Sequence, residues 1–236
     1  ELSIMHKVDA SIVLSDVEYD LLKSVQSIFK IPFARFINGG NINFEDRRGI
    51  VFFGSFKHDP NIDAVNYFIN DIFPIILEKN KNIIFHIAGS YCPDEIKNIN
   101  HKNIKVHGYV KNIDKFLNQF KLAVVPIRFG AGIKGKIATS LSNGTPAVVS
   151  KLASEGMGLT HNKNILIAKN RNDYVKYILD LVSNKDKWNS LSRAGEDYAI
   201  KRFGYNTAYK NFQTLLKKLK IDENHPQLRL NNKLYH

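Results

Sequence analysis

The clearest sign of architecture in this chain is the stretch at residues 122–136, LAVVPIRFGAGIKGK. Its first four residues are all apolar, which is typical of a strand buried on both faces of a parallel sheet. A loop containing Gly130 and Gly132 follows, and the chain then continues into a helix pattern. The stretch therefore predicts a strand, a glycine-rich loop and a helix in succession.

Strand and helix patterns of this kind alternate along most of the chain. Further apolar runs predict strands at 50–53, 83–88, 104–106, 146–149 and 165–167. Apolar residues at helical spacing predict helices at 65–76, 113–120, 172–184, 186–202 and 205–219. Pro74 should interrupt the first of these helices. The alternation predicts an α/β fold, a Rossmann-like parallel sheet with helices on both faces.

A shorter fragment with similar patterns precedes this block. We expect a strand at 10–14, a helix at 16–29 and a strand near 33–37. The polar, glycine-containing residues 38–41 are typical of a linker. At the other end, residues 221–236 show no periodicity, and we expect this tail to be mobile.

The acidic alternation of Asp16, Glu18 and Asp20 could suggest a metal site. However, Ser15 lies three residues before Glu18, which is the spacing of a capping box that opens a helix. The eight histidines include no pair at the i, i+4 spacing of a helical zinc site. We therefore predict a helix start here and no metal site in the chain.

The composition is that of an ordinary folded protein. The chain has 236 residues, 44% of them hydrophobic, which is enough for a large buried core. Its only cysteine is Cys92, so no intramolecular disulfide can form, and a reducing compartment is favoured. No apolar run is long enough to span a bilayer, and no signal peptide is evident. We expect a cytoplasmic protein, or one that is peripheral on the cytoplasmic face of a membrane.

The charge balance favours anionic partners. The sequence contains 34 Lys and Arg against 22 Asp and Glu, a net charge of +12. Solvated basic faces explain the excess equally well, because lysine is spread along the whole chain. Recognition of nucleic acid would require a known motif or clustered basic residues, and neither is found, so we predict no nucleic-acid partner.

The glycine-rich loop is the best candidate for an anion site. Gly130 and Gly132 allow the backbone to approach a ligand closely, and Arg128 can donate to two phosphate oxygens at once. Lys134 and Lys136 add compact positive charge. The helix that follows contributes unpaired N–H groups and the positive end of its dipole. The alternative is a solvated basic turn.

Several separated motifs occur along the chain in a fixed order. They are VFFGSFKHDPN at 51–61, HGYV at 107–110, RFGAGIKGK at 128–136, SNGTPAVVS at 142–150 and SEGM at 154–157. Together they resemble the donor-binding, C-terminal half of group 1 glycosyltransferases with the GT-B fold. The resemblance covers roughly residues 50–200. It implies a remnant of the acceptor domain and a linker at 1–44, a nucleotide-sugar-binding domain at 45–203, and a C-terminal helix and tail at 204–236.

The resemblance implies an enzyme that transfers a sugar, with retention of configuration, from a nucleotide-diphosphate-sugar donor to a glycan or lipid-linked acceptor. Neither a metal nor a cofactor other than this donor substrate is implied. Arg128 and Lys134 would be catalytic, because they would neutralise the diphosphate as it leaves. The remaining donor-binding residues would be Gly54, Ser55, Tyr109, Val110, Gly130, Gly132, Lys136, Thr139 and Glu155. The acceptor site would belong to another domain of a longer chain, and polysaccharide biosynthesis is the expected process.

The chain departs from the family pattern at two positions. The family commonly has two glutamates, the second of which binds the ribose hydroxyls, and these positions align with Ala131 and Thr139. A non-catalytic binding or assembly module is therefore the alternative function. Glu155 is a candidate contact to the donor, although it is equally well explained as a loop residue beside Gly156.

Overall fold

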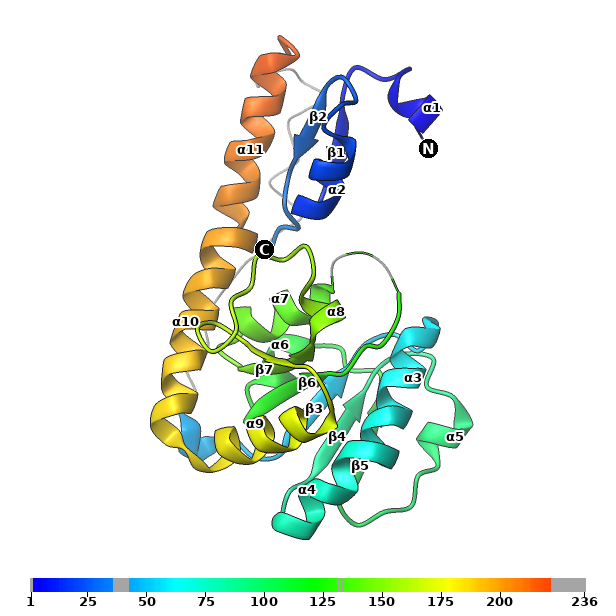
Figure 1. Cartoon of the computed structure of the whole chain (residues 1–236), viewed down its shortest axis with the longest axis vertical. Helices are drawn as coiled ribbons and strands as arrows, with labels where there is room; N and C mark the ends of the chain where they lie inside the picture. Colours follow the sequence, from blue (N-terminus) through cyan, green and yellow to red (C-terminus); the bar gives the residue numbers. More distant parts are fainter. Residues whose placement is uncertain (1, 36–42, 131, 133, 222–236) are drawn as a thin grey trace.

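The computed structural model describes residues 2–35, 43–130, 132 and 134–221, and its centre is a six-stranded sheet (Figure 1). All neighbouring strands are parallel, in the order β5-β4-β3-β6-β7-β8. The strands are β3 (Ile50–Phe53), β4 (Phe85–Ala88), β5 (Ile104–Gly108), β6 (Leu122–Val125), β7 (Ala147–Ser150) and β8 (Leu166–Ala168). This confirms the predicted Rossmann-like parallel sheet.

The strand order reverses at the centre of the sheet. From β3 the chain moves outward through β4 to β5, then returns to β6 beside β3 and continues in the opposite direction through β7 to β8. In open α/β sheets, ligands bind beyond the carboxyl ends of the strands at such a reversal. The loops that follow β3 and β6 are therefore the first place to look for a site.

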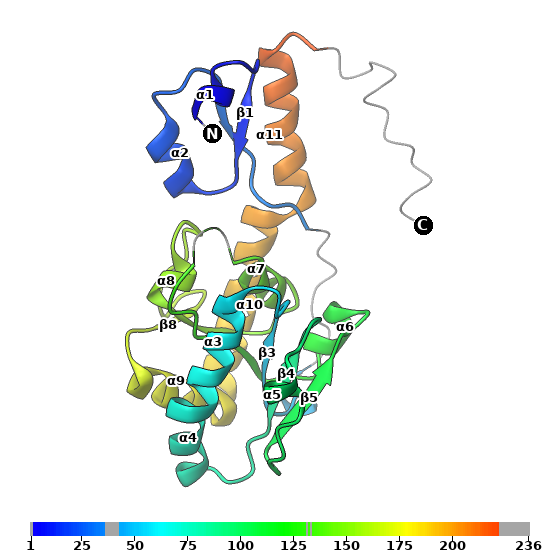
Figure 2. The ribbon, with the colours of Figure 1, turned by 90° about the vertical axis from the view of Figure 1, so that its right-hand side faces the viewer.

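Helices cover both faces of the sheet (Figures 1 and 2). On one face α3 and α4 pack together with α9, and on the other α7 packs against α10. Their bounds and those of the shorter helices are α3 (Asp59–Tyr67), α4 (Phe73–Lys79), α5 (Asp94–Lys97), α6 (Ile113–Leu117), α7 (Gly135–Ser142), α8 (Lys151–Ser154), α9 (Arg171–Ser183) and α10 (Lys185–Phe203). All residues of β3 and β6 are buried between these layers, as their continuous apolar pattern predicts.

The interruption expected at Pro74 is present. After α3, a single π-helical turn at Phe68–Ile72 separates it from α4. Pro74 lies in the first turn of α4, where a missing N–H leaves no helix hydrogen bond unmade. The helices predicted at 113–120, 172–184 and 186–202 correspond to α6, α9 and α10.

The first residues form a separate two-stranded parallel sheet that lies beside the last helix (Figures 1 and 2). Its elements are α1 (Leu2–Met5), β1 (Ser11–Val13), α2 (Asp16–Leu22) and β2 (Ile28–Lys30), and the helix beside it is α11 (Tyr205–Lys218). The predicted capping box is observed, because Ser15 Oγ accepts from the backbone N–H of Glu18 and Ser15 N–H donates to the Glu18 carboxylate.

Two predictions in this fragment are wrong. The helix expected at 16–29 ends at Leu22, because Ser27 adopts a left-handed φ of 62° and residues 28–30 pair with β1 as a strand. No strand forms over the described part of 33–37, where Pro32 just before it supplies no N–H for a ladder. Arg35 makes a single bridge to Gly204 instead. The predicted linker at 38–41 and the tail beyond residue 221 lie outside the described residues.

Candidate functional site

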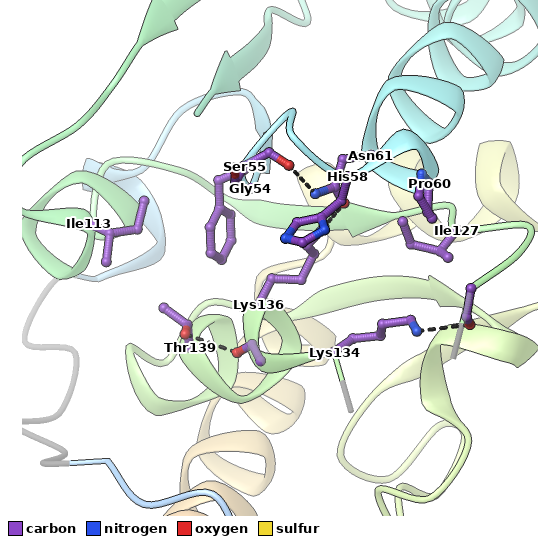
Figure 3. Close-up of a pocket in the computed structure, with 13 residues that line it drawn as sticks. Gly54, Ser55, His58, Pro60, Asn61, Ile113, Ile127, Lys134, Lys136 and Thr139 are labelled. Atoms are coloured by element: carbon purple, nitrogen blue, oxygen red, sulfur yellow. Dashed lines mark hydrogen bonds between the residues drawn. The ribbon is translucent and has the colours of Figure 1, made fainter. Parts of the chain in front are cut away.

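A cavity of about 700 Å³ opens where the strand order reverses, beyond the carboxyl ends of β3 and β6 (Figure 3). It is bounded by the loop after β3, the start of α3, the glycine-rich loop and the first turns of α7. The lining residues are Phe53, Gly54, Ser55, His58, Pro60, Asn61, Ile113, Ile127, Gly130, Lys134, Gly135, Lys136 and Thr139. Six of the sequence-predicted site residues meet here: Gly54, Ser55, Gly130, Lys134, Lys136 and Thr139.

Gly54 lies where two polar side chains approach the backbone. A Cβ atom at this position would lie 3.0 Å from Lys136 Nζ and 3.0 Å from Asn61 Nδ2. A side chain here would therefore require both groups to shift by a few tenths of an ångström. The absence of a side chain lets the loop after β3 close over the lysine.

Lys136 is the cation most withdrawn from solvent in this cavity. Its ammonium donates to Asn61 Oδ1 and lies 4.6 Å from the centre of the Phe52 ring. Burial, followed by repulsion from Lys134, lowers the pKa of Lys136 from 10.5 to about 7. An anion bound beside Lys136 would favour the protonated ammonium, so binding of phosphate and uptake of a proton would be coupled.

Lys134 has a different position, since it holds the shape of the glycine-rich loop. Its ammonium donates to the carbonyl oxygens of Gly130 and Gly132, both at 3.0 Å. These glycines have φ values of 104° and 81°, in the region that other residues rarely adopt. Burial lowers the pKa of Lys134, and the negative charge of Glu155 opposes this effect. The loop therefore presents its backbone and a lysine to the cavity together.

Arg128 does not line the cavity. Its guanidinium forms a bidentate ion pair with the Asp63 carboxylate, with Nε 2.9 Å from Oδ2, and lies 4.6 Å from the centre of the Tyr67 ring. The hydrogen bond to Asp63 raises the pKa of Arg128. The side chain is 53% exposed and lies along α3. A role beside Lys134 would require Arg128 to leave Asp63.

A second cavity of about 430 Å³ adjoins the first and shares Gly130 and Lys134 with it. It lies between α2 and the loops that follow β6 and β7. Its other lining residues are Ser15, Val17, Glu18, Leu21, Gly132, Leu152, Glu155 and Gly156. The structure thus separates Gly132 and Glu155 from the first cavity but keeps them next to it.

The predicted contacts Tyr109 and Val110 follow β5. Tyr109 is 73% exposed and lines a third cavity of about 760 Å³ beyond β4 and β5, whereas Val110 packs partly against the core. Ala131 lies outside the described residues. Thr139 lines the first cavity, and its hydroxyl accepts a hydrogen bond from Arg35 at 2.7 Å.

Sequence reasoning named His58, which lines the first cavity, as a weak candidate for ligand contact, and it assigned no role to Asn61 or Arg35. Asn61 and His58 had a local signal, because they follow Gly54 at the end of a predicted strand. Arg35 had none, since it lies 104 positions from Thr139 and in a segment predicted as a strand. Within the described residues, no group of three or more His, Cys, Asp or Glu side chains could hold a metal ion. None of the described helices is long and apolar enough to cross a membrane.

An open α/β domain with lysines in a cavity at the strand-order reversal defines the class: a Rossmann-like domain suited to a phosphorylated ligand. The model of the family described as "Glycosyl transferases group 1" matches residues 47–184 of the chain. The chain therefore belongs to the group 1 glycosyltransferases.

Known proteins with similar sequence or structure are longer than this chain. An uncharacterized 44.6 kDa protein in the cps region of Klebsiella pneumoniae is 22% identical over 167 residues, which are 65% of this chain and 43% of that protein. The structure of a mutant of S. aureus TarM in complex with fondaparinux, alpha-GlcNAc-glycerol and UDP has a TM-score of 0.74 and 21% identity, over 91% of this chain and 45% of that one. The pneumococcal O-GlcNAc transferase GtfA, in complex with UDP and GlcNAc, has a TM-score of 0.71 and 13% identity, over 92% and 47%. The chain thus spans less than half the length of these proteins, and its sheet matches their Rossmann-like GT-B fold.

Proposed function

We propose that this chain is the donor-binding half of a glycosyltransferase that transfers a sugar from a nucleotide-diphosphate-sugar to a glycan or lipid-linked acceptor. The observation that carries this proposal is Lys136, a cation held in a cavity at the strand-order reversal beside the N-terminus of α7. A diphosphate is the part of a sugar nucleotide that such a cation and such a helix end would bind. The complexes of TarM and GtfA with UDP support a uridine nucleotide as the first ligand to test.

The proposed chemistry follows from where charge develops. Breaking the bond between sugar and diphosphate leaves additional negative charge on the diphosphate. Lys136, Lys134 and the backbone N–H groups at the start of α7 would stabilise this charge without a metal ion. The second cavity, which contains Glu155, would receive the sugar, and the loop containing Tyr109 and Val110 would receive the base. Retention of configuration remains part of the proposal.

We propose that the acceptor is bound by a domain other than the one described above. The chain matches less than half the length of the Klebsiella protein and of TarM, so we propose that an acceptor domain acts together with it. The position of the Klebsiella relative in a cps region supports a role in polysaccharide biosynthesis. We propose that the enzyme works in the cytoplasm or on the cytoplasmic face of a membrane, where the net charge of +12 would favour acidic headgroups.

Calorimetric titration of the chain with UDP, GDP and inorganic pyrophosphate tests the proposal. We expect at least one nucleoside diphosphate to bind, and to bind more tightly than pyrophosphate. The alternative, a non-catalytic module, is favoured by Thr139, which carries no carboxylate where the family commonly has glutamate. A folded chain that binds none of the three ligands would support that alternative and overturn the donor-binding proposal.

A further inference from the structure

The second cavity has two walls that come from distant parts of the chain. One wall is α2, which contributes Val17, Glu18 and Leu21. The other is the segment after β7, which contributes Glu155 and Gly156. Both ribbon views show α2 directly above α8 and the loop that follows it (Figures 1 and 2). The width of the cavity therefore depends on what holds α2 and this loop in place.

Arg202 on α10 holds the first wall. Its guanidinium donates from Nη2 to Asp16 Oδ2 at 2.6 Å, and Asp16 is the first residue of α2. Lys30 on β2 donates to the other oxygen of the same carboxylate. Burial acts to raise the pKa of Asp16, but the hydrogen bonds from Arg202 and Lys30 outweigh it and lower the pKa, so the carboxylate stays charged. Asp16 thus fastens α2 to α10 and to β2.

Tyr198 holds the second wall. It lies four residues before Arg202, on the same face of α10, and its hydroxyl donates to the carbonyl oxygen of Met157, the residue after Gly156. Gly158 permits this approach, because it has a φ of 65° and a Cβ there would lie 2.8 Å from the Tyr198 hydroxyl oxygen. One face of α10 therefore contacts both walls of the cavity.

The two walls meet at one end of the cavity. A Cβ on Gly156 would lie 3.1 Å from Ser15 Cβ, so the loop and the start of α2 are closely packed there. The cavity also reaches Gly130 and Lys134, which line the first cavity as well. A small displacement of either wall would therefore change the space beside the proposed phosphate site.

We infer that Arg202 and Tyr198 are positioning residues that set the separation of the two walls, and hence the fit of the donor's sugar. Neither residue lines the cavity, so both act through the walls that they hold. The inference rests on the proposed function, in which the second cavity receives the sugar.

Amide hydrogen exchange, followed by NMR, tests the two contacts without a ligand. Arg202→Met keeps an unbranched side chain and removes the bond to Asp16, so exchange in residues 16–22 should become at least about threefold faster, while residues 155–158 change little. Tyr198→Phe removes only the hydroxyl and should give the opposite pattern. Arg193→Met is the matched control, because Arg193 is exposed on the same helix and takes no part in these contacts, and it should change neither segment.

Calorimetric titration tests the consequence for the sugar. The ligands are UDP, UDP-glucose and UDP-N-acetylglucosamine, or GDP and GDP-mannose if GDP is the tighter nucleotide. In Arg202→Met and in Tyr198→Phe, at least one nucleotide sugar should bind about threefold to tenfold more weakly, the effect of one misaligned hydrogen bond. The nucleotide alone should change by less than about twofold. Arg202→Lys, which keeps a cation opposite Asp16, should restore most of the affinity for the sugar.

The alternative outcomes are distinct. A purely structural role would weaken nucleotide and nucleotide sugar by the same factor, and this result, or unchanged affinities in both variants, would overturn the inference while the proposed function stands. Unchanged exchange of α2 in Arg202→Met would overturn it too. If Arg202→Met does not fold, Asp16→Ala removes the same bond from α2 and should give the same changes. If the folded chain binds no nucleotide and no nucleotide sugar, the proposed function fails, and the role in sugar fit fails with it.

Discussion

Lys136→Met is the substitution that probes the proposed site most directly. Methionine keeps an unbranched apolar side chain between Phe52 and the loop after β3, and it removes the ammonium. A hydrogen bond between a charged donor and a phosphate contributes about 1.5–3 kcal/mol, which corresponds to about a tenfold to 150-fold change in affinity. At pH 6, where Lys136 is protonated, we therefore expect nucleoside diphosphate binding to weaken by at least about tenfold in calorimetry.

The same substitution should make the ligand-free chain more stable. Lowering the pKa from 10.5 to about 7 corresponds to roughly 5 kcal/mol, at 1.36 kcal/mol for each pKa unit. This is an upper limit, because Lys136 keeps part of its contact with water and gains from Asn61 and Phe52. We expect methionine to raise the free energy of unfolding by about 1–3 kcal/mol, measured by urea denaturation at pH 6.

Opposite changes in affinity and stability are the diagnostic result. Lys176→Met serves as the control for the loss of one positive charge, since Lys176 is exposed on α9, and it should change neither quantity appreciably. The reasoning would be refuted if Lys136→Met bound the nucleotide as tightly as the unchanged chain. Equal losses of stability and affinity would instead indicate that Lys136 supports the fold.

Three further predictions concern proton linkage and the neighbouring arginine. Because the pKa of Lys136 in the folded chain lies near 7 and its usual value is 10.5, the unfolded chain binds more protons between these pH values. The stability of the ligand-free chain, measured by denaturation, should therefore rise with pH in this window, and nucleotide affinity, measured by titration, should fall. Both pH dependences should become weaker in Lys136→Met. Burial lowers the pKa of His86 to about 4, and the side chain lies 2.9 Å from a histidine nitrogen on β5. The stability of the chain should therefore decline as the pH falls from 6.5 toward 4, and His86→Gln should reduce this slope. Arg128→Ala should change nucleotide affinity by less than about threefold, because Arg128 lies outside the first cavity and is bound by Asp63 on α3; a tenfold loss in calorimetry would show that Arg128 leaves Asp63 for the ligand.

Local patterns predicted the sheet and one part of the cavity. Strands buried on both faces have no polar positions, so runs such as IVFF at 50–53 and LAVV at 122–125 could be assigned without other information. Because parallel strands end at the same edge, Gly54 and Lys136 could be expected near each other. The residue pairs that complete the site lack such a signal. Arg35 and Thr139 are 104 positions apart, and only the assembled fold brings them together.

The position of Arg128 shows a different limit of sequence reasoning. A loop containing an arginine and two lysines indicates an anion site, but the pattern does not say which cation a neighbouring carboxylate has already neutralised. Asp63 lies on α3 and captures Arg128, whereas Lys136 finds only an amide oxygen among the described residues. The same segment therefore supplies one cation to the protein surface and another to the cavity.

Arg47 and Lys136 are both withdrawn from solvent, but they differ in how many acceptors the fold supplies to them. Arg47 is fully buried, and burial lowers its pKa to about 10, yet it donates to the carbonyl oxygens of Phe120 and Asn143 and to Thr145 Oγ1. The fold itself thus satisfies this guanidinium, as expected of a buried charge that serves stability. Lys136 has one acceptor in the described residues and faces an open cavity. Under the proposed function, a bound anion would offset the cost of holding Lys136 there, which would tie that cost to binding rather than to folding.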